Sequence, residues 1–262
     1  MNYIKMSPIA GMSGYGGGAT ALPFSGAASV ASTGKWQGTR GILFNGYYSG
    51  SNKDVIQYFT IASLGNTADF GDTVIDTRGR GSASDGTIGF VAGGFSDHWD
   101  DDIGYITIGT TGNATDFGNL TSAGNRTAVC DGAYGIMGGK SESNIIDYIV
   151  VATPGDATDF GDFLGTGMGS AGSTNDATRA IWFGGHQGDD VMDYITMASA
   201  GNAADFGDMF DTGYAQASGV TANSTRGLVA GGVNSMETIQ YVVVQTLSNG
   251  IDFGFNMYWM KF

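Results

Sequence analysis

Five tyrosines recur along the chain at intervals of 43 to 47 residues, and each lies 12 residues before a phenylalanine. Each phenylalanine is the centre of an Asp-Phe-Gly triplet, and a glycine pair lies upstream in four copies, with Asn-Gly in the first. A fixed period of this length indicates a repeat architecture. The repeated positions are Tyr58, Tyr105, Tyr148, Tyr194 and Tyr241, Phe70, Phe117, Phe160, Phe206 and Phe253, and Gly94, Gly139, Gly185 and Gly232.

Each copy has the pattern of four short strands. In the last copy a small-residue run at 213–220 precedes a Thr-Arg-Gly run that ends at the glycine pair, and a β-branched run at 238–244 and the Asp-Phe-Gly segment follow. No segment shows sustained helical periodicity. Four strands in about 46 residues is the size of one propeller blade. The sequence therefore predicts an all-β, five-bladed β-propeller with four antiparallel strands per blade.

The predicted domain limits follow from starting each blade at its small-residue strand. The blades then cover about 25–73, 74–120, 121–163, 164–209 and 210–254, which leaves an apolar segment at 1–24 and an aromatic tail at 255–262. Two alternatives stay open for these ends: they pair and close the ring, or they anchor the subunit to another chain.

The repeated residues have a structural interpretation. Glycine pairs such as Gly93-Gly94 leave no Cβ where backbones crowd, and they permit positive φ at the end of a strand. In Asp-Phe-Gly we expect the aspartate to cap a turn, the phenylalanine to pack and the glycine to turn the chain. The tyrosine and phenylalanine of each copy are expected to fill the contacts between blades.

Composition excludes several classes of protein and partner. The 262 residues include 46 glycines, 3 prolines and one cysteine, Cys130, so neither a collagen nor a disulfide scaffold fits. The formal net charge of −14 opposes a nucleic-acid partner, which needs a basic face. No stretch is long and apolar enough for a membrane span, and the N-terminus lacks the apolar run of a signal peptide.

With its glycine pair, a tyrosine in Ile-x-Tyr and an aromatic in Asp-Phe-Gly, the repeat resembles the kelch family over residues 25 to 254. Phenylalanine stands where kelch repeats usually have tryptophan. The segment Gly112-Asn113-Ala114-Thr115-Asp116-Phe117-Gly118 resembles in particular the kelch-like "GNATDFGD" repeat proteins of marine bacteriophage virions and tail regions. The kelch resemblance implies the propeller fold, and the phage resemblance implies a place in the particle.

No motif predicts catalysis or a cofactor. Asp-Phe-Gly lacks the other protein-kinase motifs, and the two histidines with Cys130 are too few for a copper or zinc centre. We therefore expect no catalytic residue, no cofactor and no transition metal. The loop carboxylates Asp97, Asp100, Asp101 and Asp102 form a weak calcium candidate, for which a solvated acidic loop is the alternative.

The loops that follow the glycine pairs differ between copies, and by propeller geometry they share one face. Exposed aromatic side chains among polar ones suit a carbohydrate-binding or protein-binding face, while the alternative is simple solvent exposure. The candidate ligand-binding residues are Tyr47, Tyr48, Phe95, His98, Trp99, Lys140, His186, Gln187 and Asn234.

The function expected from the resemblance is a non-enzymatic virion structural or attachment protein, either a tail-fibre or a capsid-decorating module, made in the host cytoplasm. Its expected partners are other virion proteins, through 1–24 and 255–262, and a host-surface glycan or receptor. Two alternatives are an intracellular kelch-type interaction module and a glycan hydrolase.

Overall fold

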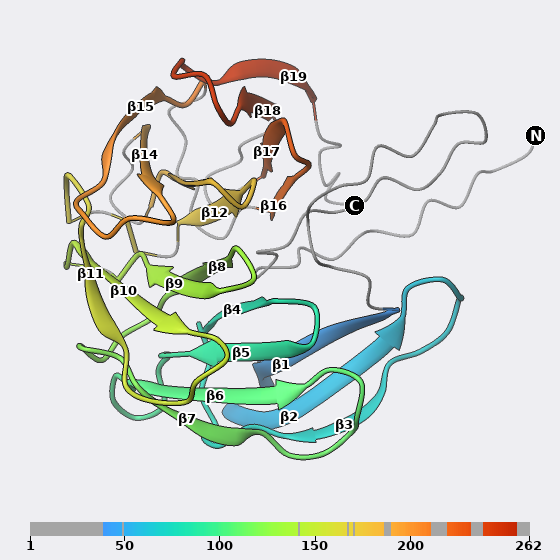
Figure 1. Ribbon diagram of the computed structural model, residues 1–262. Coiled ribbons are helices and arrows are strands. Elements are labelled where there is room, and N and C mark those ends of the chain that lie inside the picture. Colours follow the sequence, from blue (N-terminus) through green and yellow to red (C-terminus); the bar gives the residue numbers. More distant parts are fainter. Residues whose placement is uncertain are drawn as a thin grey trace, which may run out of the picture.

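The computed structural model describes residues 39–48, 50–140, 142–166, 168–169, 171–185, 190–210, 219–231 and 238–255. This part of the chain contains strands and no helix (Figure 1), so none of its elements is a helix long and apolar enough to cross a membrane. The strands are β1 (Arg40–Tyr48), β2 (Ser51–Thr60), β3 (Ala68–Asp72), β4 (Gly81–Ser84), β5 (Ile88–Ala92), β6 (Asp102–Thr107), β7 (Thr115–Asn119), β8 (Thr127–Cys130), β9 (Tyr134–Gly138), β10 (Ile145–Val150), β11 (Thr158–Asp162), β12 (Gly172–Asn175), β13 (Arg179–Phe183), β14 (Val191–Thr196), β15 (Ala204–Asp208), β16 (Gly219–Ala222), β17 (Arg226–Ala230), β18 (Thr238–Val243) and β19 (Ile251–Phe255).

The strands form five antiparallel meander sheets that follow one another around an axis (Figure 1), and this confirms the five-bladed β-propeller. Blades 2 to 5 have four strands each, and β1, β2 and β3 are the described strands of blade 1. Neighbouring blades contact one another mainly through their inner strands, β4 with β8, β8 with β12, and β12 with β16. The segment 1–24, with its expected anchoring or ring-closing role, lies outside the described residues, as does 256–262.

The repeated tyrosines and phenylalanines hold equivalent places in all five blades. Each tyrosine pairs in register with the residue two before its phenylalanine, as Tyr148 does with Thr158. Each tyrosine ring meets its phenylalanine edge to face, with centroids 5.7 to 6.1 Å apart and interplanar angles of 79 to 87°. Such aromatic pairs contribute about 0.5–1.5 kcal/mol beyond their burial.

The role expected of Asp-Phe-Gly is confirmed in blades 2 to 4, where the aspartate Oδ1 accepts a hydrogen bond from the glycine N–H and the phenylalanine is buried. The glycine has positive φ, and the strand pairing shifts register beside it. In blade 3, Gly161 has a φ of 147°, and a Cβ there would collide with the Gly201 carbonyl of the next blade. This glycine is therefore required by both the turn and the approach of the next blade.

The hydrophobic core is divided into clusters that each join two neighbouring blades. Phe160 of blade 3, for example, is buried in one cluster with Ile195, Met197 and Ala203 of blade 4. The other clusters join blades 1 and 2, blades 2 and 3, and blades 4 and 5. The phenylalanines of blades 1 to 4 therefore fill inter-blade contacts as predicted, whereas the prediction is wrong for Phe253 of blade 5, which is 54% exposed.

Candidate functional site

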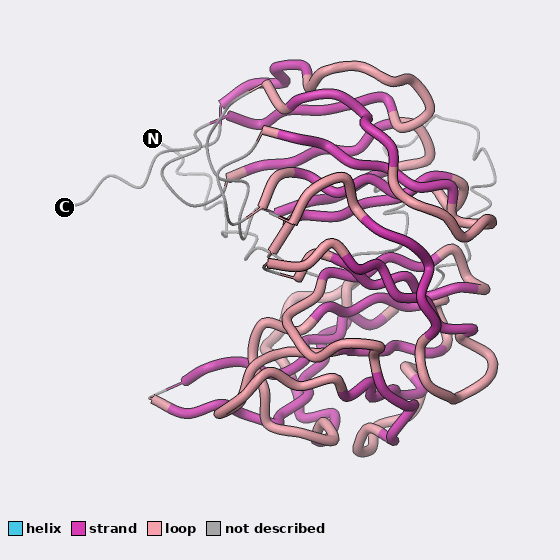
Figure 2. Tube along the Cα trace, turned by 90° about the vertical axis from the view of Figure 1, so that its left-hand side faces the viewer, coloured by secondary structure: helices cyan, strands magenta, loops and turns pink. Residues whose placement is uncertain are grey.

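The most distinctive surface of the described chain is an aromatic cluster at the junction of blades 1 and 2, formed by Tyr47, Arg78, Phe95 and Trp99. Tyr47 lies near the end of β1, in a hairpin with β2 that projects from the body (Figure 2). Phe95 and Trp99 come from the loop after the blade 2 glycine pair, and Arg78 comes from the linker between the two blades. We call these four residues the junction cluster.

The arginine is the centre of the cluster. The Arg78 guanidinium carbon lies 4.5 Å from the centroid of the Tyr47 ring and 5.0 Å from that of Phe95. Its Nη1 donates to Asn52 Oδ1 at 3.2 Å, and Asn52 Nδ2 donates to the Phe95 carbonyl at 3.3 Å. The Arg78 guanidinium thus lies against both rings, and hydrogen bonds join Arg78 to Asn52 of blade 1 and to Phe95 of blade 2. These contacts hold the cluster in a fixed arrangement.

Two aromatic rings of the junction cluster, those of Trp99 and Tyr47, are partly exposed to solvent. Trp99 packs edge to face against Phe95 with centroids 4.9 Å apart, and backbone pairing also joins the two residues. Trp99 is 47% exposed and Tyr47 is 57% exposed. Large rings that are held rigidly and half-exposed beside polar groups suit the recognition of a ligand with both apolar and hydroxyl-bearing faces.

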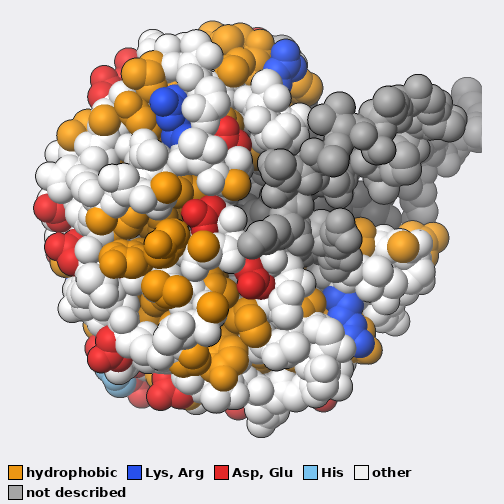
Figure 3. All heavy atoms as spheres, in the orientation of Figure 1, with side chains coloured by type: hydrophobic (Ala, Val, Ile, Leu, Met, Phe, Trp, Pro, Cys, Tyr) orange, Lys and Arg blue, Asp and Glu red, His pale blue; other side chains and the backbone are white. Residues whose placement is uncertain are grey.

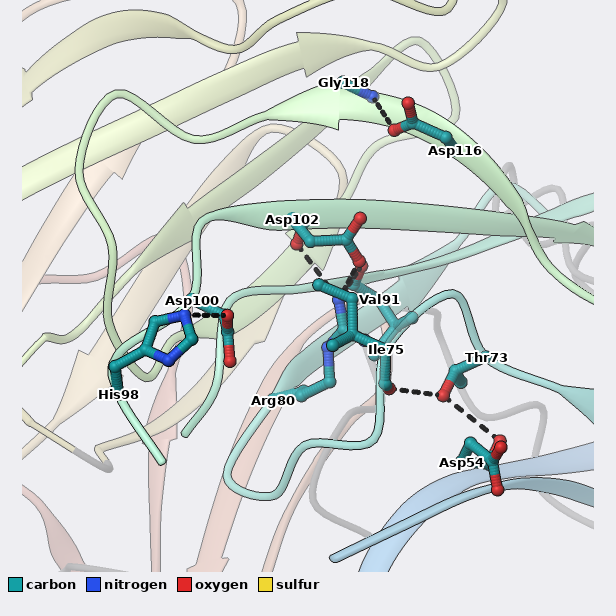
Figure 4. A network of polar contacts seen from close by, with 10 residues as sticks. All are labelled: Asp54, Thr73, Ile75, Arg80, Val91, His98, Asp100, Asp102, Asp116 and Gly118. Carbon is teal, nitrogen blue, oxygen red and sulfur yellow. Dashed lines mark hydrogen bonds and ion pairs between the residues drawn. The ribbon is translucent and has the colours of Figure 1, made fainter. Parts of the chain in front are cut away.

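The loop between Phe95 and Trp99 also leads into a buried ion pair at the start of blade 2 (Figure 4). Arg80 Nη2 donates to Asp102 Oδ2 at 2.7 Å and to the Asp102 carbonyl at 3.0 Å, and both side chains are almost fully buried. Burial raises the pKa of the Asp102 carboxyl, while the bond to Arg80 pulls that pKa down. The pair therefore holds the end of the loop that follows Trp99 in place at the start of β6.

The acidic residues of the calcium candidate have other contacts. Asp102 faces Arg80, and Asp100 Oδ1 lies 3.2 Å from the exposed His98 imidazole (Figure 4). In the described ranges, no three histidine, cysteine or carboxylate side chains form a group that could hold a metal ion. The calcium candidate of Asp97, Asp100 and Asp102 therefore gains no support from the arrangement of these side chains.

The remaining sequence candidates lie apart from the junction cluster or outside the described residues. Lys140 follows the blade 3 glycine pair, and its Nζ donates to Ser122 Oγ of the preceding linker at 2.8 Å. Burial and then the Arg126 charge lower the pKa of Lys140. The Tyr48 side chain and residues His186, Gln187 and Asn234 are outside the described part.

Sequence reasoning missed Arg78 and Asn52, which join the two blades. Both lie outside the loops that follow the glycine pairs, where the candidates were sought. The available signal was the run Thr77-Arg78-Gly79-Arg80, the densest basic segment of an acidic chain. Elsewhere Lys and Arg are few and well separated on the face shown in Figure 3, with no continuous basic stripe there.

Comparisons with known proteins give no further assignment. No protein-family model matches the sequence, and no curated protein is similar to it. The likeness to kelch and phage repeats is therefore a resemblance of the repeat motif alone, while the five-bladed architecture rests on the structure.

Proposed function

We propose that this protein is a non-enzymatic binding module of a bacteriophage particle, in the tail-fibre or capsid-decorating class, and that the junction cluster binds a carbohydrate of the host surface. The observation that supports the binding role is the pair of half-exposed rings, Tyr47 and Trp99, held on Arg78 and Phe95. The repeat motif supports the place in a particle, through its resemblance to phage proteins.

A carbohydrate suits this surface for a chemical reason. A pyranose has an apolar face of C–H groups that stacks on an aromatic ring, and a rim of hydroxyls that needs donors and acceptors. The cluster offers both, because the Arg78 guanidinium and the Asn52 amide lie among the rings. The support is rigid, which limits the entropy lost on binding.

Binding should be measured with the full chain against an array of pyranose oligosaccharides and against polysaccharide purified from the host envelope. Replacing Trp99 or Tyr47 by alanine should weaken binding at least tenfold, since each removes a stacking surface. Leu247→Ala is the matched control, because Leu247 is 53% exposed in blade 5 and should bind as the wild type does. Equal affinity in the Trp99→Ala and wild-type proteins would refute the assignment of this surface.

The place in the particle has a separate test. Mass spectrometry of purified virions should find the protein at a fixed ratio to the major structural proteins. Its recovery only as free protein from the lysate would leave the sugar-binding result standing and would overturn the virion assignment.

A further inference from the structure

Each junction between two blades uses the same part of the following blade. Phe160 of blade 3 shares a hydrophobic cluster with Ile195, Met197 and Ala203, which lie one, three and nine positions after the tyrosine of blade 4. Phe117 shares a cluster with the equivalent residues of blade 3. In all four junctions the N–H nine positions after the tyrosine donates to the carbonyl of the residue after Asp-Phe-Gly, at 2.7 to 2.8 Å. The third strand of a blade and the turn after it therefore cover the preceding blade.

An arginine at the start of the second strand adds a polar contact to two of these junctions. The guanidinium carbons of Arg40 and Arg179 lie 4.6 and 4.4 Å from the centroid of the repeated tyrosine of their own blade. Arg40 Nη1 donates to the Ile108 carbonyl at 3.0 Å, and Arg179 Nη1 donates to the Val244 carbonyl at 2.9 Å. Both carbonyls lie three positions after the tyrosine of the next blade, so each arginine binds the strand that covers its own blade.

Blade 5 has the same groups without partners among the described residues, on the outer face that does not pack on blade 4. Phe253 is 54% exposed there, whereas its four equivalents are 2 to 5% exposed. Arg226 lies 4.7 Å from the Tyr241 ring centroid, yet no carbonyl in the described part of the chain accepts from its guanidinium. Blade 1, at the other end of the described arc (Figure 1), is also open, since Ile61 is 42% exposed and its four equivalents are 0 to 6% exposed.

The sequence of residues 1–17 repeats the part of a blade that covers such a face. Residues 1–6 read Met-Asn-Tyr-Ile-Lys-Met, and four of the six match Met-Asp-Tyr-Ile-Thr-Met at 192–197. Tyr15 lies 12 positions after Tyr3 and is followed by a glycine, which is the tyrosine-to-aromatic interval of all five blades. The positions that cover a preceding phenylalanine are all apolar in this segment, and they are Ile4, Met6 and Met12.

We propose that residues 1–17 lie against the outer face of blade 5 as a third and a fourth strand and close the ring between blades 5 and 1. Ile4 and Met6 cover Phe253, in the way that the equivalent residues of blade 4 cover the phenylalanine of blade 3. The Met6 carbonyl accepts from Arg226, as the equivalent carbonyl of blade 5 accepts from the arginine of blade 4. The exposed ring and the unused guanidinium of blade 5 thus both gain partners.

The same segment fits the open side of blade 1. Tyr15 takes the place of a preceding blade's phenylalanine and covers Ile61. The N–H of residue 17 donates to Asn66, which occupies the position of the asparagines that accept this bond in blades 2, 4 and 5. On the blade 5 side this side-chain bond is absent, because Gly11 stands at the asparagine position. One segment of the chain therefore supplies partners for both open faces.

The connection from this segment to blade 1 is long enough for closure within one chain. In the four junctions of the described chain, 14 to 17 positions separate the residue after Asp-Phe-Gly from the residue before the second strand of the next blade. The corresponding residues here, 17 and 39, are 22 positions apart. The chain can therefore run from the proposed strands into blade 1 along the path that joins the other blades, and no second copy is needed to supply them.

Thiol reactivity in the full chain tests the cover over blade 5. Phe253→Cys and Leu247→Cys place a thiol in the same blade at residues that are 54 and 53% exposed, while Cys130 is buried. With residues 1–17 in place, a maleimide should label Phe253→Cys at least tenfold more slowly than Leu247→Cys. Adding Met6→Asp should raise the first rate to the second and leave the Leu247→Cys rate unchanged. The Met6→Asp background also suits stability measurements on Phe253, because the phenylalanine keeps there the exposure that the described blades leave it.

The labelling rates also identify the chain that supplies the cover. Protection of Phe253→Cys should be the same at low and at high protein concentration, because the contact lies within one chain. Protection that is lost on dilution would mean that a second copy supplies the segment, and it would overturn closure within one chain. Equal labelling of Phe253→Cys and Leu247→Cys at every concentration would refute the cover itself.

Cysteine cross-linking tests the proposed pairing by a second route. Gly11→Cys and Phe255→Cys replace the counterparts of Asn249 and Asp208, which bond across the junction of blades 4 and 5. The double variant should form an intrachain disulfide on oxidation, and the control pair Gly11→Cys and Leu247→Cys should not. A disulfide found only between chains would overturn closure within one chain, and the absence of any disulfide would overturn the proposed pairing.

Discussion

The role of the repeated phenylalanines in the core between blades can be tested by replacing two of them, one at a time, with alanine. Phe160 and Phe253 occupy the same place in the repeat, and each meets its tyrosine edge to face, at 5.9 and 6.0 Å. They differ in surroundings, because Phe160 is 5% exposed under blade 4 while Phe253 is 54% exposed. Replacing each by alanine therefore separates the inter-blade contribution from the contribution within the blade.

The expected magnitudes follow from burial. Phe160→Ala removes a buried ring from a packed cluster and leaves a cavity, so it should cost about 3–5 kcal/mol of unfolding free energy. Phe253→Ala leaves no cavity and loses about half of the 1.5–3 kcal/mol that full burial of such a side chain contributes. With the loss of the aromatic pair included, we expect about 1–3 kcal/mol for Phe253, and so a difference of about 2 kcal/mol between the midpoints of the two ranges.

The assay is equilibrium urea unfolding followed by tryptophan fluorescence, to which the buried Trp182 contributes, with refolding checked for reversibility. Equal losses for the two variants would mean that the phenylalanine acts only within its own blade. In that case the inter-blade role of the repeat would be wrong.

Three further predictions concern single buried groups, each measured by the free energy of unfolding. Gly161→Ala should cost more than Gly254→Ala, although both residues have a φ near 148°, because backbone strain of about 1–3 kcal/mol applies to both and the collision with Gly201 applies only to Gly161. Arg80→Met should cost about 3–5 kcal/mol by leaving Asp102 buried without its cation, and the double variant Arg80→Met, Asp102→Leu should recover part of this loss. Burial raises the pKa of Asp193, whose Oδ2 accepts a hydrogen bond from the Leu164 N–H. The stability that this group contributes is therefore complete below an unfolded pKa of about 3.9 and is lost as the pH rises through the raised folded value. Asp193→Asn should remove this decline with rising pH, and an unchanged pH profile would contradict the prediction.

The blade architecture could be predicted because its determinants are local and repeated. The Tyr-to-Phe interval, the Asp-Phe-Gly turn and the glycine pair each act within a few residues of sequence, and five copies make the pattern unambiguous. The glycine pair shows the physical reason, since a Cβ on Gly93 would collide with the Gly124 carbonyl of the next linker. The sequence named Tyr47, Phe95 and Trp99 as separate loop candidates, but it could not place them in one cluster.

Buried charges could not be predicted, because nothing in the local sequence distinguishes them from solvated ones. Arg126 and Asp147 are fully buried, and Asp147 accepts a hydrogen bond from Thr121 Oγ1 in the preceding linker. Asp193 and Gln240 occupy the same repeat position as Asp147, one residue before the tyrosine, and both accept from the backbone of the equivalent linker. The side chain before the repeated tyrosine therefore joins its strand to the preceding linker by a hydrogen bond. Its residue type varies because either a carboxylate or an amide oxygen can accept from the linker N–H.

The exposure of Phe253 shows where repeat symmetry fails as a guide to burial. Sequence equivalence predicts equal packing for the five phenylalanines, yet only those of blades 1 to 4 are buried, and Phe253 of the last blade is 54% exposed. Gly254 nevertheless forms the same turn as its equivalents, with a φ of 148° and its N–H donated to Asp252 Oδ1 at 2.9 Å. The exposure of Phe253 therefore follows from what lies beside blade 5 and not from the fold of the blade itself.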